Sequence, residues 1–337
     1  MRIILDIMSG DRAPLETLRG AVDAKKENYS EGGDFTLVGD EKVIRKTAEE
    51  NHLDISGFEI VHTDVTLDMH DEPMSVMKEK KDSSLSRGLN MLAKGEGDAF
   101  VSCGNTGALF CGSTLILKRV KGVQRAAIGA IMPLTKPFML MDSGASVKVN
   151  EDYLHMFGVM GTAYMKAIYG IENPTVAMIN NGAEEHKGGE LQLAAYELLK
   201  NAPVNFIGNV EARDLMSGVC DVVVADGFSG NVALKMAEGV ASSVMKMIKG
   251  VFYKNVITKI AALLVLPHMK SVKETMDYKK IGGAPVIGVK KPVFKAHGNS
   301  DAEAFKSAIG LAKASVENNF IEKLENNLKT AGKAEEE

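Results

Sequence analysis

Six short loops, each rich in glycine and polar side chains, hold most of the residues in this sequence that could bind an anion. Each loop follows an apolar run typical of a strand. Backbone N–H groups bind phosphate in such loops, above all where a helix begins directly afterwards. A single glycine indicates no more than a tight turn, so the prediction rests on the six loops together. The residues that we expect to bind phosphate or another part of a substrate are Gly10, Asp11, Arg12, Gly104, Asn105, Thr106, Gly107, Asp142, Asn209, Arg213, Asp226, Ser229 and Gly230.

Two of these loops are the best placed to hold phosphate because a helical pattern follows each of them. Gly104–Gly107 precedes the pattern at Ala108–Leu117. Gly227–Asn231 precedes a second pattern at Val232–Met247.

Three further side chains are candidates for a direct part in catalysis. Lys187 lies in a polar loop between a strand and a helix, where its ammonium group could neutralise phosphate or polarise a carbonyl. His297 could protonate a leaving group near neutral pH. Asn231 could orient phosphate or a carbonyl oxygen, as Asn105 and Asn209 could. A solvated lysine and a histidine that only holds a turn remain open alternatives.

The elements that must position these loops alternate along the chain. Short apolar runs and longer amphipathic runs predict an α/β fold, with a layered, mostly parallel sheet and helices on both faces. Loops that follow the strands of such a sheet line its ligand crevice. We expect one elaborated catalytic domain over residues 1–329 and a disordered tail over 330–337. Strands are predicted at Arg2–Ile7, Phe35–Val38, Phe58–His62, Ala99–Ser102, Ala126–Met132, Phe138–Asp142, Thr175–Ile179, Val204–Gly208 and Val219–Ala225.

Composition favours a cytoplasmic enzyme without metal or cofactor. The 337 residues are 45% hydrophobic, which is enough for a large core. The three cysteines form no disulfide or metal pattern, and no two histidines have ligand spacing. A net charge of -4 gives no sign of nucleic-acid binding. We expect neither a signal peptide nor a membrane-spanning run.

A basic and apolar segment stands out from the rest of the chain. Between Lys246 and Lys295 lie eleven lysines, no arginine and two acidic residues, a formal charge of +9. Such a segment would suit an anionic membrane surface or an acidic carrier protein. A pair of core helices with a solvated lysine face is an equally compatible interpretation. We expect a helical docking element at about 246–280, with Lys254, Ile257, Lys259, Ile260, Leu263, Leu264 and Lys270 at its surface.

The loop motifs resemble, in their order, those of the bacterial phosphate acyltransferases that begin phospholipid synthesis. This resemblance implies transfer of a fatty acyl group from acyl carrier protein to inorganic phosphate, which yields an acyl phosphate. It also implies a fold related to phosphate acetyltransferases and isocitrate-dehydrogenase-like enzymes, a homodimer, peripheral association with the inner face of the cell membrane, and an essential Lys187. The motifs are Asp6–Pro14, Asp71–Pro73, Gly104–Leu109, Gly208–Asp214, Asp226–Val232 and Lys295–Asp301.

Three positions depart from the pattern of that family. Ser9 and Arg12 stand where the family usually has glycine and histidine, and Ser146 stands where it usually has asparagine. Arginine stays protonated, so Arg12 is no general base, although it could hold an anion. Phosphate is already an anion and a thiolate leaves readily. The reaction therefore needs alignment and charge neutralisation rather than a nucleophilic side chain.

Two alternatives from different classes remain open. A coenzyme A-dependent phosphate acetyl- or butyryltransferase shares the reaction type, but it has no need of the basic, apolar segment. A non-catalytic scaffold that recruits carrier protein to the membrane would leave the six polar loops unexplained. A dinucleotide-dependent dehydrogenase is disfavoured because no G-x-G-x-x-G motif follows the first strand.

Overall fold

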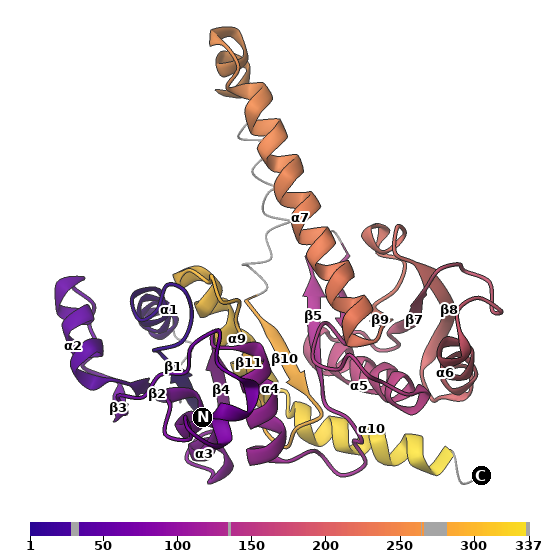
Figure 1. Cartoon of the computed structure of the whole chain (residues 1–337), viewed down its shortest axis with the longest axis horizontal. Helices are drawn as coiled ribbons and strands as arrows, with labels where there is room; N and C mark the ends of the chain where they lie inside the picture. The colour runs from indigo at the N-terminus through magenta and orange to yellow at the C-terminus, as the bar shows by residue number, and fades with distance from the viewer. Residues whose placement is uncertain (28–33, 134–135, 264, 266–281, 335–337) are drawn as a thin grey trace.

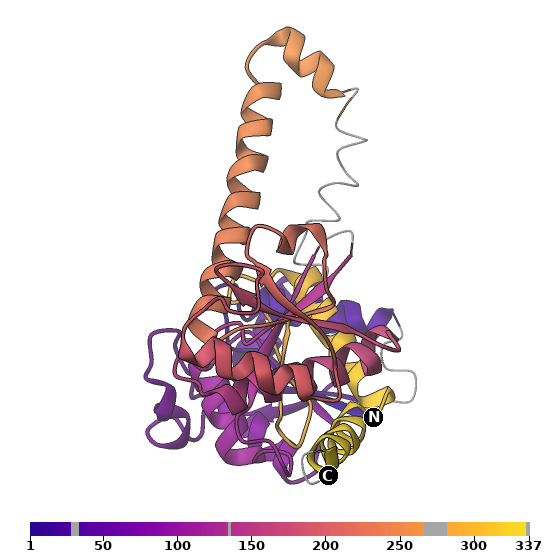
Figure 2. The same ribbon diagram turned by 90° about the vertical axis from the view of Figure 1, so that its right-hand side faces the viewer.

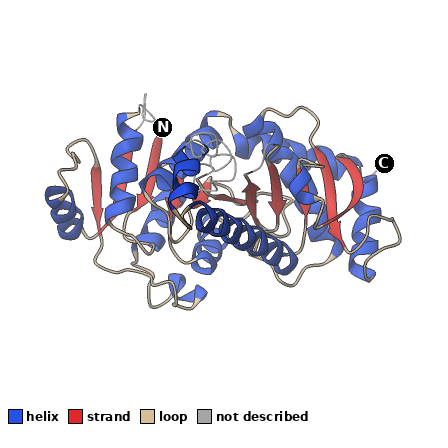
Figure 3. Ribbon diagram, turned by 90° about the horizontal axis from the view of Figure 1, so that it is seen from above, coloured by secondary structure: helices blue, strands red, loops and turns tan. Residues whose placement is uncertain are grey.

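The computed structural model describes residues 1–27, 34–133, 136–263, 265 and 282–334. Its strands form a single sheet that crosses the whole body of the molecule (Figures 1 and 3). The strands are β1 (Arg2–Asp6), β2 (Asp34–Gly39), β3 (Glu59–His62), β4 (Ala99–Ser102), β5 (Ala127–Met132), β6 (Phe138–Met141), β7 (Thr175–Asn180), β8 (Asn205–Glu211), β9 (Val222–Val224), β10 (Ala284–Ile287) and β11 (Val293–Lys295). The helices are α1 (Leu15–Lys26), α2 (Glu41–Glu50), α3 (Ser84–Ala93), α4 (Thr106–Gly112), α5 (Glu151–Tyr169), α6 (Glu190–Asn201), α7 (Gly227–Phe252), α9 (Ala302–Glu317) and α10 (Phe320–Ala334).

The strand order is β3-β2-β1-β4-β11-β10-β5-β6-β9-β7-β8. Neighbouring strands are parallel except around β10 and β5, where β10 pairs antiparallel with β11 and β5, and β5 with β6. The mostly parallel α/β sheet is therefore confirmed. All nine predicted strands are present, with ends shifted by a few residues. The sequence reading missed β10 and β11, which are only four and three residues long.

Helices cover both faces of the sheet because buried side chains alternate along each strand. In β1, Ile3 and Leu5 pack against α1 and α9, whereas Ile4 packs against α3 on the opposite face. In β9, Val222 and Val224 pack against α5, α6 and α10. Val223 faces the first turns of α7. Because helices cover both faces of the sheet, its strand ends and the loops that follow them remain uncovered.

Helix α7 leaves the body and projects far beyond it (Figures 1 and 2). It contains 26 residues, which corresponds to a length of roughly 39 Å. A further helical stretch, residues 256–263, lies at the far end of this projection. Among the described residues, no helix combines the length and apolar character that crossing a membrane requires.

Helix α10 includes part of the segment from residue 330, for which disorder stays a prediction. Its backbone stays helical through Ala334. The segment after Leu328 is rich in lysine and alanine, which are good helix formers, so the pattern of the helix continues into it. Residues 335–337 lie outside the described residues.

Candidate active site

A cavity of about 690 Å³ lies at the edge of the sheet where β1, β4, β6, β9 and β11 end. The loops after these strands contribute Asp11, Thr106, Ser143, Asn231 and His297 to its wall. Loops far apart in the sequence thus meet at one place, as expected for the carboxyl ends of parallel strands. The apolar part of the wall comes mainly from β5 and α7.

Lys295 is a buried ammonium group in this wall and ends β11. Only 8% of the residue is exposed, and its Nζ donates hydrogen bonds to the carbonyl oxygens of Cys103, at 3.1 Å, and Ala296. No carboxylate of a described residue lies within ion-pairing distance of it. Burial lowers the pKa of Lys295 to about 8, although Cys103, Asp11 and Asp6 act in the opposite direction. The group therefore keeps most of its charge at neutral pH while it lacks a counterion.

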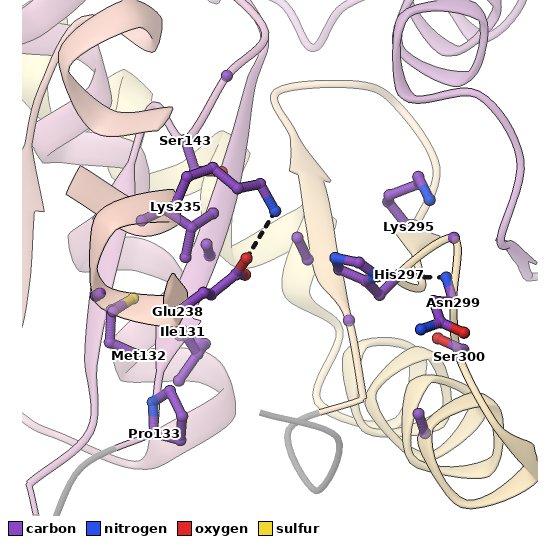
Figure 4. Close-up of a pocket in the computed structure, with 18 of the residues that line it drawn as sticks. Ile131, Met132, Pro133, Ser143, Lys235, Glu238, Lys295, His297, Asn299 and Ser300 are labelled. Carbon is purple, nitrogen blue, oxygen red and sulfur yellow. Dashed lines mark hydrogen bonds and ion pairs between the residues drawn. The ribbon is translucent and has the colours of Figure 1, made fainter. Parts of the chain in front are cut away.

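His297 reaches from the loop after β11 towards α7, where Lys235 and Glu238 form an ion pair of 2.8 Å (Figure 4). Burial, and next the positive charge of Lys235, lower the pKa of His297. Its Nδ1 accepts a hydrogen bond of 3.3 Å from the backbone N–H of Asn299. A neutral ring in this arrangement carries its proton on Nε2.

Ser300 adds a buried hydroxyl to the same wall. The residue is 5% exposed, and no nitrogen or oxygen atom of a described residue is hydrogen-bonded to its Oγ. The neighbouring Cys103 thiol is a weak partner, and burial raises the pKa of that thiol to about 12. Cys103 therefore stays protonated, in agreement with a packing role.

Asp142 organises the loop after β6 instead of facing a ligand. It is fully buried, and its carboxylate accepts backbone N–H bonds from Ile128, Gly144, Ala145 and Ser146 at 2.6–3.2 Å. Burial raises the pKa of Asp142, and these four hydrogen bonds oppose that shift. The start of α7 packs closely on this loop. A Cβ atom at Gly230 would lie 1.9 Å from the carbonyl oxygen of Asp142, so only glycine fits.

Two other predicted ligand residues cap helices. Asn105 accepts a hydrogen bond from the N–H of Ala108 at the start of α4, and its amide donates to the carbonyl oxygens of Met69 and Asp71. Asp226 caps α7 by accepting bonds from the N–H groups of Phe228 and Ser229. The Ser229 hydroxyl also donates to Asp226. These polar groups hold the loops in place.

The first loop approaches the His297 loop directly. Gly10 has φ +114°, and a Cβ atom there would lie 2.8 Å from Cys103. The N–H of Asp11 donates to the carbonyl oxygen of Gly298 at 2.8 Å. Arg12 is exposed and does not line the cavity. In the second loop, Gly107 is close to Pro73, where a Cβ atom would lie 2.8 Å from the ring.

Lys187, Asn209 and Arg213 do not line this cavity: Lys187 is on the loop after β7, Asn209 is within β8, and Arg213 is on the loop after β8. Asn209 donates a hydrogen bond to the carbonyl oxygen of Glu184, and Asn180 donates to that of Lys187, so that two amides fix the Lys187 loop. Arg213 pairs with Glu211 at 2.5 Å and remains 79% exposed on its side chain.

Sequence reasoning missed three residues in the cavity wall. Lys235, Lys295 and Ser300 line it. Two signals were available: Lys295 and Ser300 lie in the motif Lys295–Asp301 of the family resemblance, and Lys295 directly follows the apolar pair Val293-Phe294, where a lysine that ends a buried strand is unusual.

The predicted docking residues lie on the described part of the projection. Ile257, Ile260 and Leu263 are 78%, 58% and 72% exposed, so in a single chain they are not core residues. Lys254 and Lys259 are exposed as well. Leu264 and Lys270 lie outside the described residues.

Comparison with known proteins places this architecture in a family. The model of the family described as "Fatty acid synthesis protein" matches residues 1–323. "Phosphate acyltransferase" of Thermoanaerobacterium thermosaccharolyticum is 42% identical over 333 residues, which cover 98% of each chain. "Phosphate acyltransferase" of Acetivibrio thermocellus is 43% identical over 326 residues, 96% of this chain and 95% of the relative. A phosphotransacetylase from Streptococcus pyogenes shares the fold, with a TM-score of 0.62, 16% identity and 94% of each chain covered.

Proposed function

We infer the detailed reaction of this chain from its membership of the phosphate acyltransferase family, to which it belongs over nearly its full length. The chain is an enzyme that transfers an acyl group to phosphate, in fatty acid and phospholipid synthesis. We propose that the donor is a fatty acyl thioester of acyl carrier protein and that the product is a fatty acyl phosphate.

One observation carries this proposal: a single cavity has an unpaired ammonium group at one end and an apolar wall at the other. Lys295 provides the charge, and Leu234 and Met245 of α7 belong to the apolar wall. A dianion and an aliphatic chain are the two parts of the substrates that such a cavity would hold together.

In the proposed reaction, a phosphate oxygen attacks the thioester carbonyl carbon, and a tetrahedral oxyanion forms. The C–S bond then breaks as the carbonyl is restored. The carrier thiolate leaves and takes up one proton. No step needs a covalent link to the enzyme, so the enzyme contributes position and electrostatic stabilisation.

We assign phosphate to the neighbourhood of Lys295 and Ser300. The ammonium group would gain the counterion that it lacks, and the Ser300 hydroxyl would gain an acceptor. The Nε2–H of neutral His297 would donate to the oxyanion or to the departing sulfur, and Asn231 at the start of α7 would orient phosphate or the thioester oxygen.

Lys187 keeps its proposed catalytic role on different grounds, namely the resemblance of its loop to that of the family. Its loop belongs to the same edge of the sheet, and β7 is adjacent to β9, which leads into α7. The roles proposed for Asn209 and Arg213 in substrate binding rest on the same resemblance, whereas that of Arg12, which departs from the family pattern, rests on its permanent charge.

The reaction is tested by mixing the purified protein with palmitoyl carrier protein and phosphate, and by following the release of free carrier thiol. We expect release that depends on phosphate, on Lys187 and on Lys295. Parallel assays with palmitoyl-coenzyme A and acetyl-coenzyme A test the rival donor class. Thiol release without any dependence on phosphate contradicts the proposal.

A homodimer is proposed from the exposed face of α7. Apolar side chains recur there in steps of three and four residues, which places them along one side of the helix. A continuous exposed apolar stripe of this kind marks an interface, and a second copy of the chain offers the complementary surface. The stripe consists of Phe228, Val232, Met236, Val240, Val244, Met247 and Val251.

The dimer is tested with Met236→Glu/Val240→Glu, which places two charges in the middle of the stripe. Sedimentation velocity should give a dimer for the wild type and a monomer for the variant, with unchanged circular dichroism. Exposed Lys246→Glu, off the stripe, is the control and should stay dimeric.

Peripheral membrane binding is proposed for the far end of the projection. Ile257, Ile260 and Leu263 are exposed beside Lys254 and Lys259, an arrangement that suits the boundary between headgroups and acyl chains of an anionic leaflet. Liposome flotation compares the wild type with Ile257→Ser/Ile260→Ser. The proposal expects reduced flotation with anionic vesicles, and equal flotation of the two proteins excludes this tip as the contact.

A further inference from the structure

The apolar end of the cavity is built from two adjoining elements, since Met132 of β5 packs in one cluster with Leu234 and Ala237 of α7. On the β5 side, Ile131, Met132 and Pro133 lie opposite the polar residues of the loop after β11 (Figure 4). On the α7 side, Leu234, Ala237, Ala241 and Met245 follow one another in steps of three and four residues. Met216 adds a further apolar side chain to the wall.

These four α7 residues form the half-buried side of the helix, which borders the exposed apolar stripe. Their half-buried state contrasts with the exposed state of Met236, Val240 and Val244. From Leu234 to Met245 the helix rises about 16 Å. An extended alkyl chain of that length holds on the order of a dozen methylenes, given a C–C bond of about 1.5 Å.

The size of the side chains changes along this face. Near the polar end, Ala237 and Ala241 leave room beside the helix. Farther along the helix, Met245 also lines the cavity, and Met132 and Met216 are further methionines of its wall. Methionine side chains are unbranched and adaptable, so they close an apolar space without fixing its length rigidly.

We propose that the face Leu234–Met245 of α7, with Ile131–Pro133 after β5, is the subsite for an unbranched fatty acyl chain, and that Ala241 and Met245 set its preferred length. This proposal rests on the proposed function, because the polar end of the cavity must hold the thioester carbonyl. The chain then runs along α7, away from the sheet edge. Each methylene that enters the subsite should strengthen binding about fourfold, from roughly 0.8 kcal/mol per buried CH₂.

The experiment fills the subsite with Ala241→Phe and uses Ser243→Phe as the matched control. Ser243 lies on the same helix, is exposed and does not line the cavity. The rate of phosphate-dependent thiol release, expressed as kcat/KM, is measured with octanoyl, dodecanoyl and palmitoyl carrier protein. Met245→Ala is the opposite change, since it enlarges the far end of the subsite.

For Ala241→Phe we expect kcat/KM with the palmitoyl thioester to fall at least about tenfold more than with the octanoyl thioester. Ser243→Phe should leave the ratio between the two donors at the wild-type value. Met245→Ala should shift the preference towards longer chains. An equal change for all chain lengths in Ala241→Phe and Met245→Ala overturns the proposal.

A binding measurement separates this proposal from the proposed function. A fluorescent long-chain fatty acid is titrated into wild-type, Ala241→Phe and Ser243→Phe protein without phosphate or carrier protein. Loss of binding in Ala241→Phe alone supports the subsite, even if no donor gives phosphate-dependent transfer. Equal binding by all three proteins contradicts the subsite, even if transfer to phosphate is observed.

Discussion

The loops at the edge of the sheet and the helix that leaves it use their side chains in opposite ways. At the edge, the polar groups of Asn105, Asp142 and Asp226 bind protein backbone, so residues that resemble ligands serve the scaffold. Along α7, Met236 and Val251 are apolar yet exposed. The difference teaches that residue type indicates a role only together with its contacts: a polar group that binds backbone serves the scaffold, and an exposed apolar row lacks its partner surface.

The largest effect that would sharpen this comparison is expected at Asp142. Asp142→Ala removes the acceptor of four backbone N–H groups, of which those of Ile128 and Ser146 are buried. Because each unsatisfied group costs about 1–3 kcal/mol, we expect the free energy of unfolding to fall by at least ~3 kcal/mol. Chemical denaturation followed by circular dichroism measures it. A loss near zero would mean that Asp142 is not a scaffold residue.

The next effect concerns Lys295, whose charge is not satisfied by the scaffold. Lys295→Met should lower kcat/KM for phosphate-dependent thiol release by about 10²–10³-fold, the range for losing a donor to a developing charge. Lys290→Met, an exposed lysine outside the cavity, is the control. Comparable activity of the two variants would place the phosphate elsewhere.

The same lysine predicts a pH dependence. The pKa of Lys295 is lowered to about 8, so its ammonium form dominates below that pH and is lost as the pH rises through it. We therefore expect KM, expressed for the phosphate dianion, to be constant on the acid side and to rise about tenfold per pH unit above about 8. The initial rates of Lys295→Met should lack this rise. A KM that falls with pH would contradict the assignment.

The smallest effect is expected at Arg213, a charged residue outside the cavity. Its pair with Glu211 is mostly exposed, and exposed pairs contribute about 0–1 kcal/mol. Arg213→Ala should therefore change the free energy of unfolding by less than about 1 kcal/mol. If Arg213→Ala lowered the free energy of unfolding as much as Asp142→Ala, the two loops would not differ in their contribution to stability.

The fold was largely predictable because each strand of the sheet is a short apolar run with a polar boundary. Even the four-residue strand β4 has the predicted limits, Ala99–Ser102. Strands β10 and β11 were missed because they lie in the lysine-rich segment, whose charge favoured a docking element. Only tertiary pairing with β5 and β4 identifies them.

The sequence predicted where the site lies but not which contacts its residues make. The convergence of loops follows from parallel strand order, and Asp11, Thr106 and Asn231 all line one cavity. The sequence could not reveal that the amide of Asn105 is occupied by two carbonyl groups, because that depends on a loop more than thirty residues away. For the same reason, the sequence could not reveal how deeply Lys295 is buried.

Helix α7 connects two surfaces through the angular positions of its side chains. Successive residues of an α-helix turn by about 100°, so the cavity-facing row and the exposed stripe keep their directions only while the residue count is preserved. Removing a single residue after Asn231 would turn every later side chain by about 100° and present the stripe to the wrong neighbour. Removing seven would leave an error of only about 20°. The helix should therefore tolerate changes of side chain more readily than changes of length.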